Sequence, residues 1–496
     1  MMSLLAATGT AEATSDWLAA LAALVERVDG YVWGLPLILA VFVTGILITL
    51  IVRLQHLRNL GRAFRYMLFT EKGGYGEVSA FGALCTALAA TIGIGNIVGV
   101  ATAVGTGGPG ALFWMMIAAF FGMGTKYAEG LLAVKYREIS PDGRVLGGPF
   151  HYIEKGLGPR WKALAVAFAV FGAIASIMGT GTLTQIHGIT SAVQRFFDPQ
   201  FDPLDMTTGV RLFGATYSTS AVIAGALVSI SAALVLIGGV RRIAALSTLV
   251  VPVMAVTYVG ICLLAILGNV TRLPGAIRLI VLSAFDPAAM TGGAIGTVFL
   301  AVQKGISRGI FSNEAGLGTA PIAAAAAKTN EPARQGLVCM MGTFVTIVIC
   351  VMTGLVIVIT GAWEPSLGLK GADITIEAFD RGLSFLPASR FIASLFLMLS
   401  LVFFAFTTIL GWNYYAERCI EYIVGMKRRG IVRFFRFLYI LAVSVGPYLT
   451  VTVVWGVADI FNGLMAFPNL IALVLLSPVV WRETRDYLKR HPKGTD

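Results

Sequence analysis

The chain has 496 residues, of which 57% are hydrophobic and only 13% charged, and its mean hydropathy is +0.82. Because soluble domains carry roughly 25% charged residues, this composition excludes an ordinary soluble domain and predicts an all-α polytopic membrane protein. The net charge of +11 is scattered over short loops, so no nucleic-acid-binding face is expected. Five cysteines without a C-x-x-C pair and four separated histidines predict neither a disulfide framework nor a metal-binding cluster.

The N-terminal residues lack the basic and apolar regions of a cleaved signal, and Asp16–Val28 is typical of an amphipathic helix at the membrane surface. Apolar stretches of about 20 residues, the length that crosses a bilayer, then recur about eleven times. The expected spans are Trp33–Val52, Val78–Val104, Ala111–Val134, Lys162–Val193, Ala215–Ile237, Ala244–Leu267, Gly293–Ala326, Gly336–Thr360, Ala388–Ile423, Phe434–Val453 and Trp455–Trp481.

Lysine and arginine set the expected orientation, because cytoplasmic loops carry an excess of both. With the N-terminus outside, 26 of the 37 basic residues fall in inner loops and 8 in outer segments. This asymmetry predicts a multi-pass protein of the cell (plasma or inner) membrane, with its N-terminus outside and its C-terminus in the cytoplasm.

The second expected span is interrupted at its centre, where Ala89–Gly99 reads AATIGIGNIVG. Each glycine costs up to ~1 kcal/mol relative to alanine in a helix. Non-helical backbone at membrane depth survives only where it is buried in protein or lines a cavity. Transporters bind substrate and coupling ions at such broken helices, so this stretch is expected to form half of a transport site.

Two other interpretations of the same glycines were weighed. Gly93, Gly95 and Gly99 resemble a dinucleotide-binding fingerprint, but that motif requires a preceding strand and a soluble βαβ unit, which are lacking. The Gly95-x-x-x-Gly99 spacing also suits close helix packing, which accounts for Gly99 but not for Gly93 or Asn96.

A second interrupted segment, Gly305–Pro321, lies in the seventh span and contains glycines, polar residues and charges. It is the sixth helix counted from Val78, so five helices separate equivalent elements and the two breaks enter from opposite sides. Two such segments in matching places are the best sequence indication of a transporter site. The structural alternative is that Arg308 and Glu314 form an ion pair that holds the bundle together.

The ninth span places Thr407 and Thr408 among aromatic residues. Adjacent hydroxyls in this setting suit a hard cation that needs oxygen ligands. The alternative, favoured for these residues alone, is that the hydroxyls bond back to the preceding helical turn.

Together these motifs resemble the alanine or glycine:cation symporter family, the sodium:alanine symporters. The matching pieces are Gly95–Trp114, Gly122–Gly130, Gly147–Gly158, Arg308–Thr329 and Phe404–Arg418. The resemblance implies eleven helices, with a LeuT-like core of five plus five inverted helices and one extra N-terminal helix, and sodium-driven uptake of a small neutral amino acid such as alanine or glycine. No organic cofactor is implied.

The same resemblance implies the division of the chain and its site. The segments are 1–32 (extracytoplasmic), 33–77 (extra helix and basic cytoplasmic loop), 78–268 (first repeat), 269–481 (second repeat) and 482–496 (basic cytoplasmic tail). The sodium ligands implied are the carbonyls of Ala89, Ile92 and Phe404 and the hydroxyls of Thr407 and Thr408. The substrate-binding residues implied are Thr91, Gly93, Gly95, Asn96, Gln185, Phe311, Ser312, Asn313 and Trp412.

Several positions depart from the family pattern and leave the exact amino acid open. Ile94 stands where a threonine is common, and Asn413 and Ala416 replace serine and glycine. Around Gln185, the departures are Thr182, His187 and Gly188, which replace asparagine, asparagine and serine.

Three function classes were compared. An intramembrane enzyme requires a nucleophile–base or metal constellation, and a channel requires filter loops or a charge ring; the sequence shows none of these. A secondary symporter is therefore expected, with sodium as the coupling ion. Sodium is favoured because the sixth span, Ala244–Leu267, contains no Lys, Arg or His that would replace the ion. The alternative is a proton-coupled or other-cation symporter for a different small amino acid, with Glu314 as the candidate proton carrier.

Overall fold

The structure is a computed structural model that describes residues 10–69, 71, 73–141, 143–179, 181–202, 209–212, 215–285, 296–448 and 451–492. The N-terminal half contains α1 (Thr10–Val32), α2 (Leu35–Ile51), α3 (Gln55–Arg58), α4 (Leu60–Leu68), α5 (Ala80–Thr91), α6 (Val98–Gly107), α7 (Gly110–Lys135), α8 (Pro149–His151), α9 (Lys162–Met178), α10 (Leu183–Phe197), α11 (Thr219–Leu236) and α12 (Gly239–Gly268). The C-terminal half contains α13 (Leu273–Phe285), α14 (Gly296–Asn313), α15 (Ala320–Ala324), α16 (Pro332–Thr360), α17 (Ala372–Gly382), α18 (Ser389–Val424), α19 (Arg429–Val445), α20 (Val451–Leu475) and α21 (Ser477–Arg490).

Short elements connect these helices. Two hairpins pair β1 (Glu138–Ile139) with β2 (Val145–Leu146) and β3 (Val210–Leu212) with β4 (Ala215–Tyr217), each antiparallel. The remaining turns are the 3-10 helices η1 (Ile94–Asn96), η3 (Pro159–Trp161), η4 (Val270–Arg272), η6 (Pro365–Leu367) and η7 (Gly446–Tyr448) and the π-helix η2 (Tyr152–Gly156).

Nine helical segments of the described chain are long and apolar enough to cross a membrane. The first joins α1 and α2 across a short bend, so residues 20–51 form one candidate span and Asp16–Val28 belongs to a longer helix than expected. The shorter apolar helices α5 and α6 are the two parts of the interrupted second span.

Four expected spans differ from the structure. Ala215–Tyr217 form strand β4, so the fifth span begins only at Thr219. Span Lys162–Val193 is interrupted between α9 and α10. The last two spans are shifted, because α19 ends at Val445 and α20 at Leu475. Residues 293–295 of the seventh span and 493–496 of the tail lie outside the described residues.

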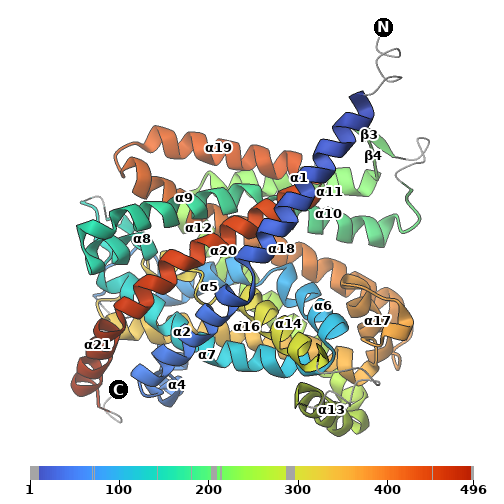
Figure 1. Ribbon diagram of the computed structural model, residues 1–496, viewed down its shortest axis with the longest axis horizontal. Coiled ribbons are helices and arrows are strands. Elements are labelled where there is room, and N and C mark those ends of the chain that lie inside the picture. Colours follow the sequence, from blue (N-terminus) through green and yellow to red (C-terminus); the bar gives the residue numbers. More distant parts are fainter. Residues whose placement is uncertain are drawn as a thin grey trace.

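The bundle has two distinct ends (Figure 1). Helices α4, α8 and α21 lie at one end, whereas α13, α17 and strands β3 and β4 lie at the other, with β3 and β4 next to the start of α1. Helices α1 and α20 lie side by side along the bundle. The start of α1 and the end of α21 therefore lie at opposite ends.

The two interrupted helices pack against one another in an antiparallel sense. Helix α5, which precedes the first break, contacts α15, which follows the second; α6, which follows the first break, contacts α14, which precedes the second. This reciprocal pairing is the arrangement that an inverted repeat requires. Helix α7 packs against α14, α15 and α16 and places its polar residues beside the second break.

Candidate functional site

The first break lies between α5 and α6. Helix α5 ends at Thr91, Ile92 and Gly93 are extended, and η1 makes one turn before α6 begins at Val98. The side chain of Asn96 holds this shape, because its Oδ1 accepts the Gly93 N–H at 3.1 Å while its own N–H donates to the Gly93 carbonyl at 3.2 Å. The expected break is confirmed.

The backbone of this break retains free donors. Among the described residues, the amides of Ile94 and Gly95 have no backbone carbonyl as partner. These donors lie just before the N-terminus of α6, where the helix dipole is positive, so they suit an anionic group.

The second break is shorter than the sequence indicated. Helix α14 continues through Phe311, Ser312 and Asn313, which form its last turn, and only residues 314–319 are irregular before α15. The irregular loop has positive φ at Glu314 (51°), Gly316 (88°) and Gly318 (82°). Glycine adopts this region readily, whereas Glu314 pays a conformational cost there.

The two breaks are bonded to each other. Asn96 Nδ2 donates to the Ser312 carbonyl at 3.2 Å, and Ser312 Oγ donates to the Gly95 carbonyl at 3.2 Å. The Phe311 ring faces Gly95, where a Cβ would lie 3.3 Å from Phe311 Cδ1. Movement of one broken helix is therefore transmitted to the other.

A carboxylate that was not assigned to the site holds the second break. Glu129 on α7 is fully buried, and its Oε1 accepts the amides of Gly316 and Gly318 at 3.1 and 3.2 Å and Asn469 Nδ2 at 2.8 Å. Asn469 also donates to the Gly316 carbonyl at 2.8 Å. The only sequence signal for this role is an acidic residue inside an apolar span.

The structural alternative weighed for the second break, an Arg308–Glu314 ion pair, does not form among the described residues. Glu314 Oε2 instead accepts the Thr319 hydroxyl at 2.6 Å, within its own loop. The Arg308 guanidinium lies over the Phe311 ring, 5.8 Å from its centroid, as in a cation–π contact.

A third break, absent from the sequence prediction, separates α9 from α10. Close packing leaves no room for side chains there, because a Cβ on Gly179 would lie 1.7 Å from Ala458 Cβ and one on Gly181 would lie 2.4 Å from Trp412 Cβ. The freed Gly181 carbonyl accepts the Tyr439 hydroxyl at 2.9 Å. This break places Gln185 in the first turn of α10, facing the first break.

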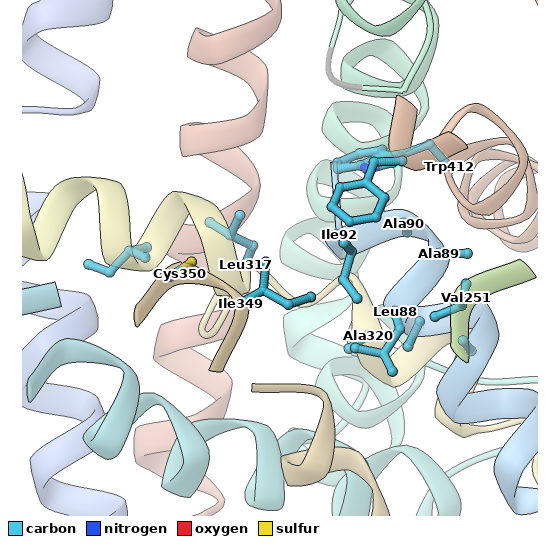
Figure 2. Close-up of a cluster of buried hydrophobic side chains, with 14 of the residues drawn as sticks. Leu88, Ala89, Ala90, Ile92, Val251, Leu317, Ala320, Ile349, Cys350 and Trp412 are labelled. Carbon is cyan, nitrogen blue, oxygen red and sulfur yellow. The ribbon is translucent and has the colours of Figure 1, made fainter. Parts of the chain in front are cut away.

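Four of the five residues expected to bind sodium meet between α5 and α18. Thr408 Oγ1 donates to the Ile92 carbonyl at 3.3 Å and to the Phe404 carbonyl at 2.9 Å, and Thr407 Oγ1 donates to Phe404 at 3.0 Å. The contacts with Phe404 are the bonds to the preceding turn that were weighed as the alternative, whereas the contact with Ile92 joins two helices. Ala89 lies one turn before Ile92 on α5 (Figure 2).

Gly93 lies between the hydroxyl of Thr408 and the amide of Gln185. A Cβ on Gly93 would lie 3.0 Å from Thr408 Oγ1 and 3.5 Å from Gln185 Oε1. Trp412 is fully buried and lies beside Ile92 (Figure 2). The structure therefore brings Gly93, Gln185 and Trp412 close to the oxygens that were expected to bind sodium.

Three other residues expected at the substrate are occupied within the fold. Thr91 Oγ1 donates to the Ala87 carbonyl of its own helix at 2.8 Å. Asn313 Oδ1 accepts the Ala315 amide at 2.9 Å. Asn96 is fully buried and bonded as described above. The side chains of Asn96 and Asn313 therefore bond to the backbone of the two breaks, whereas that of Thr91 bonds within α5.

At the end that contains α4 and α21, the flanks of the two broken helices are tied together. The Glu77 amide donates to the Ala326 carbonyl and the Lys328 amide to the Val78 carbonyl, both at 2.8 Å. The guanidinium of Arg137 donates to four carbonyls around this junction at 2.6–2.9 Å, namely those of Tyr75, Ala325, Ala327 and Thr329. Opening this end must break part of that set.

Comparison with known proteins identifies the family to which this chain belongs. A model of the sodium:alanine symporter family matches residues 18–496. The chain is 49% identical over 469 residues to an uncharacterized transporter of Haemophilus influenzae (94% of this chain, 96% of the relative). It is 43% identical over 471 residues to the sodium/alanine symporter AgcS of Methanococcus maripaludis (94% and 96%). This chain belongs to the sodium:alanine symporter family.

Membership in the sodium:alanine symporter family makes the protein a membrane transporter and excludes the enzyme hypothesis. Its fold is similar to that in the crystal structure of MhsT in complex with L-phenylalanine, with a TM-score of 0.53 at 14% identity, over 83% of this chain and 99% of that one. The expected LeuT-like fold is confirmed. The repeat boundaries and the individual site residues stay predictions.

Proposed function

We propose that this protein carries a small neutral amino acid, alanine or glycine, into the cell together with Na⁺ by alternating access. The observation that supports it best is the position of Thr408, whose hydroxyl bridges the carbonyls of two helices next to Gly93. We also propose the expected orientation, with the C-terminus in the cytoplasm.

The oxygens around Thr408 suit Na⁺ because they are neutral, buried and convergent. The carbonyls of Ile92 and Phe404 are already within hydrogen-bond distance of its hydroxyl, so a cation there would replace those bonds with ion contacts. The ion enters with the membrane field, which contributes ~2.3 kcal/mol per 100 mV for each charge.

The substrate position follows from the neighbouring backbone. The free amides of Ile94 and Gly95 would receive the carboxylate at the positive end of α6, and the C-terminal end of α14 suits the ammonium group. Gln185 would contribute a polar side chain from α10. Phe311 and Trp412 limit the remaining space, which favours the smallest side chains.

Coupling arises because ion and substrate share one segment. A cation held by the Ile92 carbonyl orders the residue that precedes Gly93, and Gly93 begins the turn that presents the amides. The hydrogen bonds of Asn96 and Ser312 pass this order to α14. Binding of one ligand therefore lowers the ordering cost of the other, which is positive linkage.

The test is uptake of radiolabelled alanine, glycine and larger amino acids into proteoliposomes at fixed external pH. We expect saturable alanine or glycine uptake that requires an inward Na⁺ gradient and disappears when choline replaces sodium. Full activity under a proton gradient alone would overturn sodium coupling.

Proton coupling is the second candidate, and one observation favours it. Lys126 Nζ and Glu129 Oε2 are buried without a hydrogen-bond partner in the described part of the chain, beside the second break. Buried ionisable groups at membrane depth often mark proton paths. In the choline experiment, a Glu129→Gln or Glu314→Gln variant that loses proton-driven uptake would identify the carrier.

A further inference from the structure

A cavity of about 660 Å³ opens where α12 and α19 begin, next to the C-terminal part of α18 and away from the transport site. Its lining is rich in charge. The lining arginines are Arg144, Arg241, Arg418, Arg429, Arg433 and Arg436, and the lining glutamates are Glu77, Glu417 and Glu421. Arginine therefore exceeds glutamate by three, so the cavity attracts anions.

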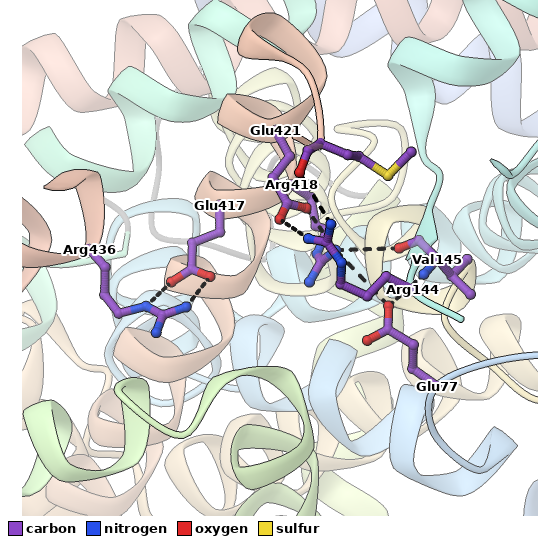
Figure 3. A network of polar contacts seen from close by, with 8 residues as sticks. Glu77, Arg144, Val145, Glu417, Arg418, Glu421 and Arg436 are labelled. Carbon is purple, nitrogen blue, oxygen red and sulfur yellow. Dashed lines mark hydrogen bonds and ion pairs between the residues drawn. The ribbon is translucent and has the colours of Figure 1, made fainter. Parts of the chain in front are cut away.

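The carboxylates of this cavity are already engaged (Figure 3). Glu417 accepts two bonds from Arg436, at 2.6 and 2.8 Å. Glu421 accepts Arg418 at 2.7 Å and Arg144 at 3.1 Å. Glu77 accepts the Val145 amide at 2.7 Å. In these contacts the glutamate carboxylates are already paired, and three of the arginines are held in place.

Two arginines at the mouth of the cavity have no partner among the residues that the structure describes. Arg241, in the first turn of α12, and Arg433, in the second turn of α19, are both exposed. Neither makes an ion pair or a side-chain hydrogen bond with any residue that the structure describes. Their guanidinium groups are the surplus charge, and guanidinium matches phosphate oxygens in a bidentate geometry.

Apolar side chains continue from the mouth of the cavity along two helices. Ile237, after the end of α11, is 66% exposed, and its carbonyl accepts Arg436 Nη1 at 3.4 Å, which places it at the cavity edge. Phe437 lies one helical turn from Arg433 and is 61% exposed, as is Phe434. A soluble phosphate ion would not contact these apolar side chains, whereas the acyl chains of a lipid would cover them.

We propose that this cavity binds the phosphate headgroup of an anionic phospholipid, held by Arg241 and Arg433, with its acyl chains along α11 and α19. Basic pockets between membrane helices bind such headgroups. The proposal does not depend on the identity of the transported amino acid or the coupling ion.

The test uses the purified full-length protein in detergent, with lipid binding measured by native mass spectrometry. The probes are phosphatidylglycerol with two oleoyl chains, phosphatidylcholine with the same chains, and inorganic phosphate. The double variant Arg241→Gln/Arg433→Gln is compared with Arg65→Gln/Arg160→Gln, which removes two exposed arginines outside the cavity. Size-exclusion profiles confirm that both variants are folded.

We expect phosphatidylglycerol to bind more tightly than phosphatidylcholine and the cavity variant to bind it about 30-fold more weakly, since each basic residue at an anionic headgroup contributes roughly a factor of five. The Arg65/Arg160 variant should bind like the wild type. Equal binding by both variants, equal loss in both, or inorganic phosphate binding as tightly as the lipid would overturn the proposal.

Discussion

The two broken helices interrupt the same fold in different ways. The first break is held by its own residue, since Asn96 closes the turn onto Gly93 only three positions away. The second break is held from outside, by Glu129 on α7 and Asn469 on α20. The first break therefore keeps the amides of Ile94 and Gly95 without a backbone partner among the described residues, whereas the amides of the second are bonded to a buried charge.

This difference assigns different roles to the two halves of the proposed site. Backbone groups in the first break remain available to ligands because a neutral side chain gives the segment its shape. The second break is rigid, because a buried carboxylate that accepts several bonds is costly to disturb. We infer that the first break senses the ligands and that the second supports it through Asn96 and Ser312.

The largest expected effect comes from filling the first break. Gly93→Leu should reduce uptake by roughly 100-fold or more, about 3 kcal/mol, the upper range for bulk forced into a packed site. Its Cβ alone would lie 3.0 Å from Thr408 Oγ1. Proteoliposome uptake measures the loss, and membrane insertion should be normal.

In a matched pair, Gly93→Ala should impair uptake and Gly99→Ala should not, since nothing lies within 4 Å of a Cβ at Gly99.

The next effect concerns the stability of the second break. Glu129→Ala leaves the amides of Gly316 and Gly318 unpaired, and each orphaned buried donor costs about 1–3 kcal/mol. We expect a clear drop in the thermal unfolding midpoint in detergent. Glu129→Gln keeps one acceptor and should lose less. Wild-type stability of Glu129→Ala would show that the second break needs no external support.

A smaller effect distinguishes the ion contacts of the first break. Thr408→Ala should raise the sodium concentration for half-maximal uptake about fivefold, equivalent to about 1 kcal/mol for one lost oxygen ligand. Thr408→Ser retains the hydroxyl and should behave like the wild type. Thr407→Ala should have less effect, because the Thr407 hydroxyl contacts only Phe404 of its own helix. Unchanged sodium dependence in both alanine variants would contradict the assignment of Thr407 and Thr408 as sodium ligands.

The smallest effect tests whether departures from the family pattern compensate each other. A Cβ on Gly188 would lie 2.0 Å from Ile94 Cδ1, so Ile94 occupies the space that a serine side chain would fill. Gly188→Ser should be destabilising alone and tolerated with Ile94→Thr. The coupling energy from a double-mutant cycle of unfolding free energies should reach about 1 kcal/mol. Additive effects would mean that the two changes are independent.

Hydropathy and composition predicted much of the fold, because a membrane helix is specified by its own local sequence. The first break was predicted for the same reason, since Gly93, Gly95 and Asn96 form a poor helix interior in any context. The charge asymmetry predicted an orientation, and the shared motifs predicted the family.

Only the tertiary structure decided where the remaining irregular backbone lies and what satisfies it. Gly179 and Gly181 do not by themselves end a helix; Ala458 and Trp412, far away in the sequence, leave no room for side chains there. Likewise, the partners of Glu129 lie on α20 and in the loop after α14, whereas Arg308 lies over an aromatic ring and not against Glu314. Hydropathy is a property of neighbouring residues, but the satisfaction of buried polar groups depends on contacts between distant ones.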